Sequence, residues 1–115
     1  MEVTASLKGY RGSASKARLV ADQIRGKGVE EALNLLALSP KRVGPPLEKL
    51  VRSALANAEV KNETQHAGID VDDLVVSEIK VDKGPSMWRI RSRAQGRATW
   101  IQRRSSHITV VLAAR

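Results

Sequence analysis

The sequence predicts a single α+β domain with the element order strand, three helices, strand, basic segment, strand. Three observations support this class. Apolar and polar residues alternate at the N-terminus, three stretches repeat apolar residues at helical spacing, and two later stretches are rich in Val and Ile. The chain has 115 residues, of which 42% are hydrophobic and 3% aromatic. We therefore expect one small core built from Ala, Val, Leu and Ile.

The first strand is expected over residues 2–8, where apolar positions alternate with polar ones. Gly9 and Gly12 are expected to form the turn that follows. The first helix is then predicted over residues 15–25, because its apolar residues recur at the spacing i, i+3, i+4, i+7. Gly26 is placed to end this helix in a left-handed conformation.

The second helix is predicted over residues 29–38, and Ser39-Pro40 ends it. The third begins at Pro45 and Pro46, since proline suits a first helical turn. Its apolar periodicity is the clearest in the chain. Residues 62–73 are expected to form a polar loop.

Two strands are predicted near the C-terminus, over residues 74–81 and 106–112, from their Val and Ile content. Between them lies the basic segment, residues 84–104, which holds six Arg and no carboxylate. The whole net charge of +8 falls in residues 80–115, because residues 1–79 carry 11 basic and 11 acidic side chains. A protein core cannot bury six unpaired guanidinium groups, so this segment meets water or a polyanion.

The simplest geometry for the basic segment is one long β-hairpin that continues the two flanking strands outward. Each arm of about ten residues would reach about 34 Å. Such a hairpin is marginal alone, so we expect its tip to be mobile until an external partner orders it. A duplex or folded RNA would supply phosphates for the Arg and base or sugar faces for the Trp. If the reversal centres on Ala94, Trp88 and Trp100 lie opposite each other. A cross-strand pair and base stacking both remain open for these two residues.

Two other interpretations of the basic segment are less favoured. A solvated loop kept for solubility would not need a uniform sign or the choice of Arg over Lys, whereas phosphate contacts favour both. A membrane-surface helix would separate Arg from apolar residues at helical spacing, and the segment does not.

Five blocks of sequence carry a known pattern, and the five occur in the family's order: SKARLVADQIRGK (15–27), SALANA (53–58), VDKGPSM (81–87), RAQGRA (93–98) and SHITVV (106–111). Together they resemble the ribosomal large-subunit protein twenty-two family of bacterial type. The resemblance covers essentially the whole chain. The chain departs from the usual residues of that family at 43–46, Trp88, Ser92 and Trp100.

The resemblance implies three helices packed on a small three-stranded antiparallel sheet, with a long protruding β-hairpin in residues 84–104 of a single domain, 1–115. It also implies binding to large-subunit ribosomal RNA, a role in subunit assembly, and a hairpin tip that lines the nascent-peptide exit tunnel. Met87, Trp88 and Arg89 fall where changes in the family alter macrolide sensitivity. The implied partners are large-subunit RNA, neighbouring large-subunit proteins and the nascent peptide.

Two groups of site residues follow from the basic side chains and the resemblance together. The tunnel-lining tip is expected at Arg91, Ser92, Arg93, Ala94, Gln95, Gly96 and Arg97. Ribosomal RNA contacts are expected from the first-helix region and the basic segment, at Arg11, Lys16, Arg18, Arg25, Lys27, Lys83, Trp88, Arg89, Arg91, Arg93, Arg97, Arg103, Arg104 and His107. Arg18 and Asp22 are spaced to form an ion pair of their own.

Other functional classes are disfavoured. His66 and His107 are the only histidines, and no catalytic arrangement or phosphate-binding loop appears, so we expect no enzyme, cofactor or small-molecule substrate. The aspartates in residues 70–73 lack the spacing of a calcium loop, so no metal is expected. A stand-alone DNA-binding protein would present a recognition helix or ribbon for the major groove, often in a dimer. Here acidic residues interrupt the basic residues of the helices, and the basic segment lies between two strands. With no secretory signal and no apolar run long enough for a membrane, a cytoplasmic, ribosomal location is expected.

Overall fold

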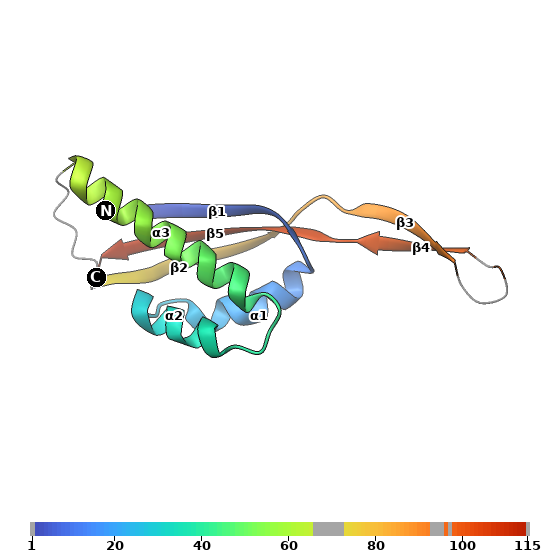
Figure 1. The fold of residues 1–115 in the computed structure, drawn as a ribbon, viewed down its shortest axis with the longest axis horizontal. Coiled ribbons are helices and arrows are strands. Elements are labelled where there is room, and N and C mark those ends of the chain that lie inside the picture. Colours follow the sequence, from blue (N-terminus) through green and yellow to red (C-terminus); the bar gives the residue numbers. More distant parts are fainter. Residues whose placement is uncertain (1, 66–72, 93–95, 97, 115) are drawn as a thin grey trace.

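The computed structural model describes residues 2–65, 73–92, 96 and 98–114. Within them, three helices and a mainly antiparallel set of strands confirm the α+β class (Figure 1). The elements in chain order are β1 (Glu2–Arg11), α1 (Ala14–Ile24), α2 (Val29–Leu38), α3 (Gly44–Gln65), β2 (Leu74–Lys83), β3 (Met87–Ser92), β4 (Ala98–Arg103) and β5 (Ser105–Ala114).

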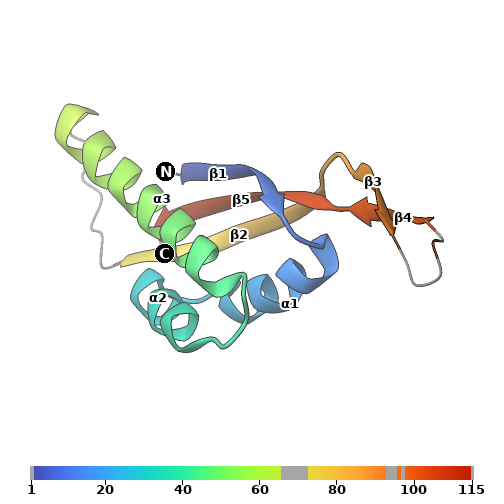
Figure 2. The same ribbon diagram turned by 45° about the vertical axis from the view of Figure 1, so that its right-hand side comes forward.

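The body of the protein is a three-stranded antiparallel sheet in the order β1-β5-β2, with the three helices on one face (Figures 1 and 2). Alternate residues of the central strand β5 point into the core, and Ile108, Val110 and Leu112 are completely buried. Each helix adds an apolar stripe, with Ile24, Leu36 and Leu47 among the largest buried side chains. The core is thus aliphatic, as the composition predicts.

The outer edge of β2 is closed by hydrogen-bond donors from α1 and the residues that follow it. Arg18 donates from Nε and Nη2 to the carbonyl of Val81, at 3.0 and 2.8 Å. Arg25 donates from Nη2 to the carbonyl of Ile79 at 2.9 Å, and the N–H of Gly26 donates to that of Val76 at 2.8 Å. These groups take the place of a neighbouring strand.

Side chains of α3 donate hydrogen bonds to carbonyls on the opposite edge of the sheet, β1. Asn57 donates from Nδ2 to the carbonyl of Thr4 at 3.2 Å, and Lys61 donates from Nζ to that of Glu2 at 3.3 Å. Both edges of the three-stranded sheet therefore carry side-chain donors from the helices that cover its face.

The predicted turn at Gly9 is wrong, because β1 continues to Arg11. Lys8 and Gly9 instead form a β-bulge opposite His107, between the pairs Leu7–Ile108 and Tyr10–Ser106. Gly9 has φ +73°, a conformation that glycine adopts readily. Its N–H donates to Nδ1 of His107 at 3.0 Å, so the amide released by the bulge is satisfied.

Of two further boundaries, one differs from the prediction and one matches it. The third helix continues to Gln65, so the predicted polar loop begins later than residue 62. Residues 66–72, which include Asp70 and Asp72, lie outside the described part of the chain. Gly26 has φ +80°, which confirms the left-handed conformation predicted after the first helix.

β3 and β4 form a second, two-stranded antiparallel sheet, here called the ribbon, beyond the ends of β2 and β5 (Figures 1 and 2). The molecule measures 65 × 26 × 16 Å, and its radius of gyration is 17.4 Å. A compact chain of this length would have a radius of gyration of about 13 Å. The link between the two strands includes residues 93–95 and 97, which lie outside the described part.

The ribbon is not a simple continuation of β2 and β5. The body ladder ends at the pair Lys83–Ser106, and the N–H of Gly84 donates to the carbonyl of Ser105 at 2.9 Å. Pairing resumes with Met87 opposite Arg103. Pro85 and Ser86 therefore oppose Arg104 alone, which is a β-bulge at the junction. The Ser105 hydroxyl donates to the carbonyl of Pro85 at 2.6 Å, and this hydrogen bond stabilises the bulge.

Candidate nucleic-acid interface

The register of the ribbon decides which side chains share a face. Trp88 lies opposite Gln102, and Trp100 lies opposite Ile90. The prediction that the two tryptophans oppose each other is therefore wrong. The ladder centres on position 95 instead of 94, and the junction bulge advances β3 by one residue relative to the body ladder. Because opposed residues share a face, Trp88, Ile90, Trp100 and Gln102 lie together on one side.

The other side of the ribbon carries arginine. Arg89 lies opposite Ile101, and Arg103 lies opposite Met87. Both arginines are exposed, as is Arg104 at the junction. Within the described residues, these three guanidinium groups form no ion pair and no hydrogen bond. Their charge is available to an external anion.

The predicted tip falls largely outside the described residues. Arg93, Ala94, Gln95 and Arg97 belong to the part that the structure does not describe. The flanking positions are placed by their backbone: Arg91 pairs with Thr99 and Ser92 with Ala98, while Gly96 has φ +72°.

Lys83 and His107 lie at the junction between body and ribbon. Lys83 is exposed at the end of β2. His107 is half-buried, and its Nδ1 accepts the hydrogen bond from Gly9. One ring nitrogen of His107 is therefore used inside the protein, and only Nε2 remains for a contact with RNA.

Three of the basic residues predicted around the first helix have internal partners. Arg18 bonds the edge of β2, as described above, and does not pair with Asp22. Asp22 pairs instead with Arg25. Lys27 lies 3.8 Å from Glu31 in a half-exposed i, i+4 pair. These interactions compete with any external contact that the same side chains make.

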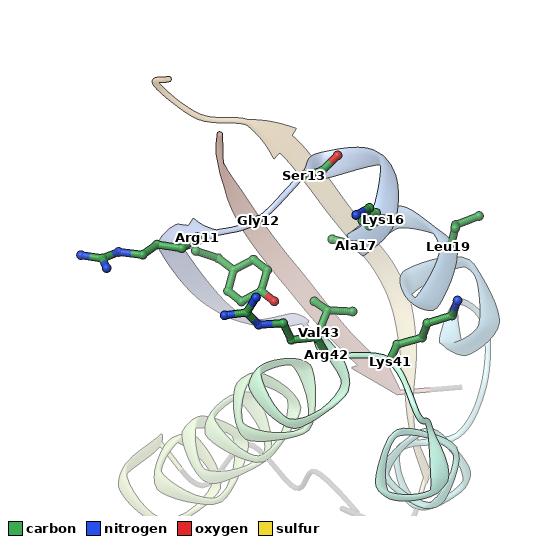
Figure 3. A pocket seen from close by; sticks show the side chains of 10 residues that line it. Arg11, Gly12, Ser13, Lys16, Ala17, Leu19, Lys41, Arg42 and Val43 are labelled. Atoms are coloured by element: carbon green, nitrogen blue, oxygen red, sulfur yellow. The ribbon is translucent and has the colours of Figure 1, made fainter. Parts of the chain in front are cut away.

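The other two, Arg11 and Lys16, line a cavity of about 470 Å³ between the end of β1, the start of α1 and the α2–α3 connector (Figure 3). Figure 3 shows Lys41 and Arg42 on the connector with their side chains extending to opposite sides, Lys41 toward Leu19 and Arg42 toward the side of Arg11, while Arg11 points outward. The lining residues are Tyr10, Arg11, Gly12, Ser13, Lys16, Ala17, Leu19, Lys41, Arg42 and Val43.

The cavity is strongly positive. Four of its lining residues are basic and none is acidic, and within the described chain none of the four takes part in an ion pair. Ser13 is the N-cap of α1, but its side chain makes no capping hydrogen bond, so the N–H groups of the first turn add partial positive charge here. Such an arrangement can bind a phosphate group.

Lys41 and Arg42 are missing from the residues that the sequence predicts to bind RNA. In the sequence they are an isolated basic pair before Val43 and two prolines. Only the folding of the connector back toward α1 brings them to the same cavity as Lys16. The one sequence signal for them is their position in a connector without any acidic residue.

The open face of the sheet has a different character. On β2, Lys80 lies 3.0 Å from Glu78, and this hydrogen-bonded ion pair raises the pKa of Lys80. Its charge is therefore balanced locally, unlike that of the ribbon and of the cavity.

Within the described residues, no helix combines the length and the apolar character needed to cross a membrane. The same residues contain no group of three or more side chains suited to hold a metal ion. In a comparison with known families, the family model for ribosomal protein L22p/L17e matches residues 5–113, nearly the whole chain.

Proposed function

We propose that this chain, which belongs to the ribosomal protein L22p/L17e family, binds ribosomal RNA through two separate basic surfaces. Members of the family are structural proteins of the large ribosomal subunit that bind its RNA. The first surface is the ribbon with its junction. The second is the cavity beside α1.

The observation that carries this proposal is the state of the ribbon's arginines. Arg89, Arg103 and Arg104 are exposed, and the basic segment contains no carboxylate that could neutralise them. Arginine donates in a planar fork that matches phosphate, so a folded RNA satisfies this charge. Most contacts go to phosphate and sugar, and the RNA is recognised by shape. Lys83, Arg91, Arg93 and Arg97 also contact the RNA in this proposal.

On the body, Arg11 and Lys16 contact RNA together with Lys41 and Arg42. The free N–H groups at the start of α1 favour a phosphate between these side chains. Arg18, Arg25 and Lys27 have a secondary role, because their side chains already bond the protein. His107 contributes through Nε2.

The resemblance to the family supports a finer assignment. The basic segment forms a hairpin that passes through the RNA, and its tip, residues 91–97, lines the exit tunnel and contacts the nascent peptide. The protein assists assembly of the large subunit, contacts neighbouring large-subunit proteins, has no catalytic activity, and resides in cytoplasmic ribosomes.

A binding experiment with large-subunit RNA across a salt series tests the proposal. Replacing Arg89 and Arg103 by Gln removes two phosphate contacts, so the slope of log affinity against log salt falls by about 2. The matched control replaces Lys49 and Arg52 by Gln, which removes the same charge from α3, and its slope stays unchanged. The full chain should also co-sediment with large subunits and crosslink to their RNA through residues 84–104.

Equal slopes for both double variants would show that overall charge drives binding and that the ribbon is not the contact surface. Equal affinity for folded ribosomal RNA and for duplex DNA of the same length would also contradict the proposal.

A further inference from the structure

The two faces of the ribbon differ in chemistry, although both are exposed. One face holds the only two tryptophans of the chain with an isoleucine between them. Trp88, Ile90 and Trp100 are 60%, 61% and 64% exposed. Large apolar side chains that share one face at this exposure indicate a surface for a partner.

The geometry of this aromatic face suits flat partners. Trp88 and Trp100 lie on a diagonal across the two strands, where neighbouring residues are about 7–8 Å apart. Gln102 lies opposite Trp88 and can donate to or accept from a group held against that indole. Indoles beside an amide offer both stacking and edge recognition.

The surrounding charge selects among possible partners. Arg89 and Arg103 lie on the opposite face of the same two-stranded sheet, and the basic segment has no carboxylate to balance them. An apolar protein partner on the aromatic face would leave this positive charge without a counter-charge. A nucleic acid brings phosphates for the arginines and rings for the indoles in one molecule. Groove binding to a duplex uses only the first of these, because paired bases are already stacked.

We infer that Trp88 and Trp100 form a stacking platform for unpaired bases of the RNA, while Arg89 and Arg103 on the opposite face contact its phosphates. The inference rests on the proposed RNA-binding function and specifies the part of the RNA that the ribbon recognises. Base–aromatic stacking of this kind is tolerant of sequence.

Tryptophan fluorescence of the full chain tests this directly, since both indoles report from the same face. We expect titration with a short single-stranded RNA to change the emission strongly, because a stacked base quenches an indole. The duplex of the same sequence should bind through the arginines with little change in emission.

Substitutions separate stacking from apolar contact. Trp88→Leu and Trp100→Leu keep an apolar side chain but remove the aromatic ring, whereas Trp88→Phe and Trp100→Phe keep a ring. Each Leu variant should bind the single strand more weakly, by roughly 5- to 150-fold, which is the loss expected when an aromatic platform is removed. The Phe variants should retain most of the affinity. Met87→Ala, on the opposite face, is the control and should bind as the unchanged protein does.

Three results would overturn the inference. The first is unchanged emission when the single strand is bound, which would leave RNA binding by the arginines intact. The second is equal affinity of Leu and Phe variants. The third is concentration-dependent self-association that the Leu variants abolish while RNA affinity is unchanged, which would make the aromatic face a contact between copies of the chain. Failure of RNA binding itself would appear differently, as no salt-dependent affinity in any variant.

Discussion

Lys16 and Arg18 lie two positions apart in the first half of α1, yet their side chains have different surroundings. The guanidinium of Arg18 makes two hydrogen bonds to the carbonyl of Val81. The ammonium of Lys16 faces the positive cavity and, within the described chain, has no ion-pair partner. Stability and RNA binding should therefore separate at these two residues.

Arg18→Ala is expected to lower the free energy of unfolding by about 1–2 kcal/mol, because the edge carbonyl of Val81 loses charged donors. Lys16→Ala should change stability by less than about 0.5 kcal/mol and weaken RNA binding instead. Urea unfolding and RNA titration of both variants measure the two effects. A Lys16 variant that unfolds more easily than the Arg18 variant would contradict this division.

Ser106 is the one buried polar side chain of the described core, and its hydroxyl has no hydrogen-bond partner there. An unpaired buried hydroxyl is costly, so Ser106→Ala should leave the free energy of unfolding unchanged or raise it by about 1 kcal/mol. Thermal unfolding checks this, with Thr109→Ala on the opposite face of β5 as the control. A clear loss of stability in Ser106→Ala would mean that the hydroxyl is satisfied in solution.

The sequence gives little indication of which single basic residues stabilise the fold and which are free to bind RNA. It groups Arg18 and Arg25 with the RNA contacts, since their spacing on the helix shows only that they are not in the apolar stripe. Their actual partners, the carbonyls of Val81 and Ile79, lie 63 and 54 residues away in the chain. Contacts of that kind depend on how α1 sits against the sheet, which no local pattern encodes.

At the scale of elements, the junction bulge sets how the ribbon joins the body. The backbone N–H of Gly84 bonds Ser105, and the hydroxyl of Ser105 bonds Pro85. A Cβ atom on Gly84 would lie 2.7 Å from that hydroxyl and 3.3 Å from the ring of His107. A side chain at this position therefore requires the Ser105 hydroxyl to shift.

Gly84→Ala is expected to lower the free energy of unfolding by about 1 kcal/mol, because the Ser105 hydroxyl must move and lose its bond to Pro85. Adding Ser105→Ala removes the clash, so the second change should cost less in the Gly84→Ala background than alone. A double-mutant cycle by chemical denaturation measures this coupling. Additive effects would show that the two side chains do not meet.

Element types are predictable from the sequence because the helices and strands have clear periodicity. The boundaries at residues 9, 65 and 84–86 are not, and both bulges among them have a tertiary cause. The bulge at Gly9 needs His107 as acceptor, and the one at Pro85 and Ser86 needs Ser105. The second bulge shifts the ribbon by one residue relative to the body ladder. Without this shift Trp88 would lie opposite Ile101, so continuing the body ladder would not pair it with Trp100 either.

For the molecule as a whole, the core and the ribbon are separate. The buried hydrophobic residues of the described chain all belong to the body, and none lies between 87 and 101. The distribution of charge along the sequence already indicates this separation, because the basic segment cannot be buried. It does not indicate the cavity beside α1, since that surface is assembled from two separate stretches, residues 10–19 and 41–43.

Removing residues 87–101, with Asn-Gly joining Ser86 to Gln102, should leave a cooperatively folded body whose stability changes by less than about 1 kcal/mol. Calorimetric unfolding measures this, and binding to large-subunit RNA should drop in the same variant. Loss of cooperative unfolding would show that the ribbon is part of the core.

The donors along the two sheet edges have a consequence for the newly synthesised protein. A strand with unpaired carbonyls and amides invites another chain to add to it, which begins aggregation. Here Arg18 and Arg25 occupy carbonyls on one side, and Asn57 and Lys61 occupy carbonyls on the other. On the ribbon, the like charge of the arginines opposes the approach of a second copy. Edge-to-edge association between free copies of the chain is therefore disfavoured before RNA is bound.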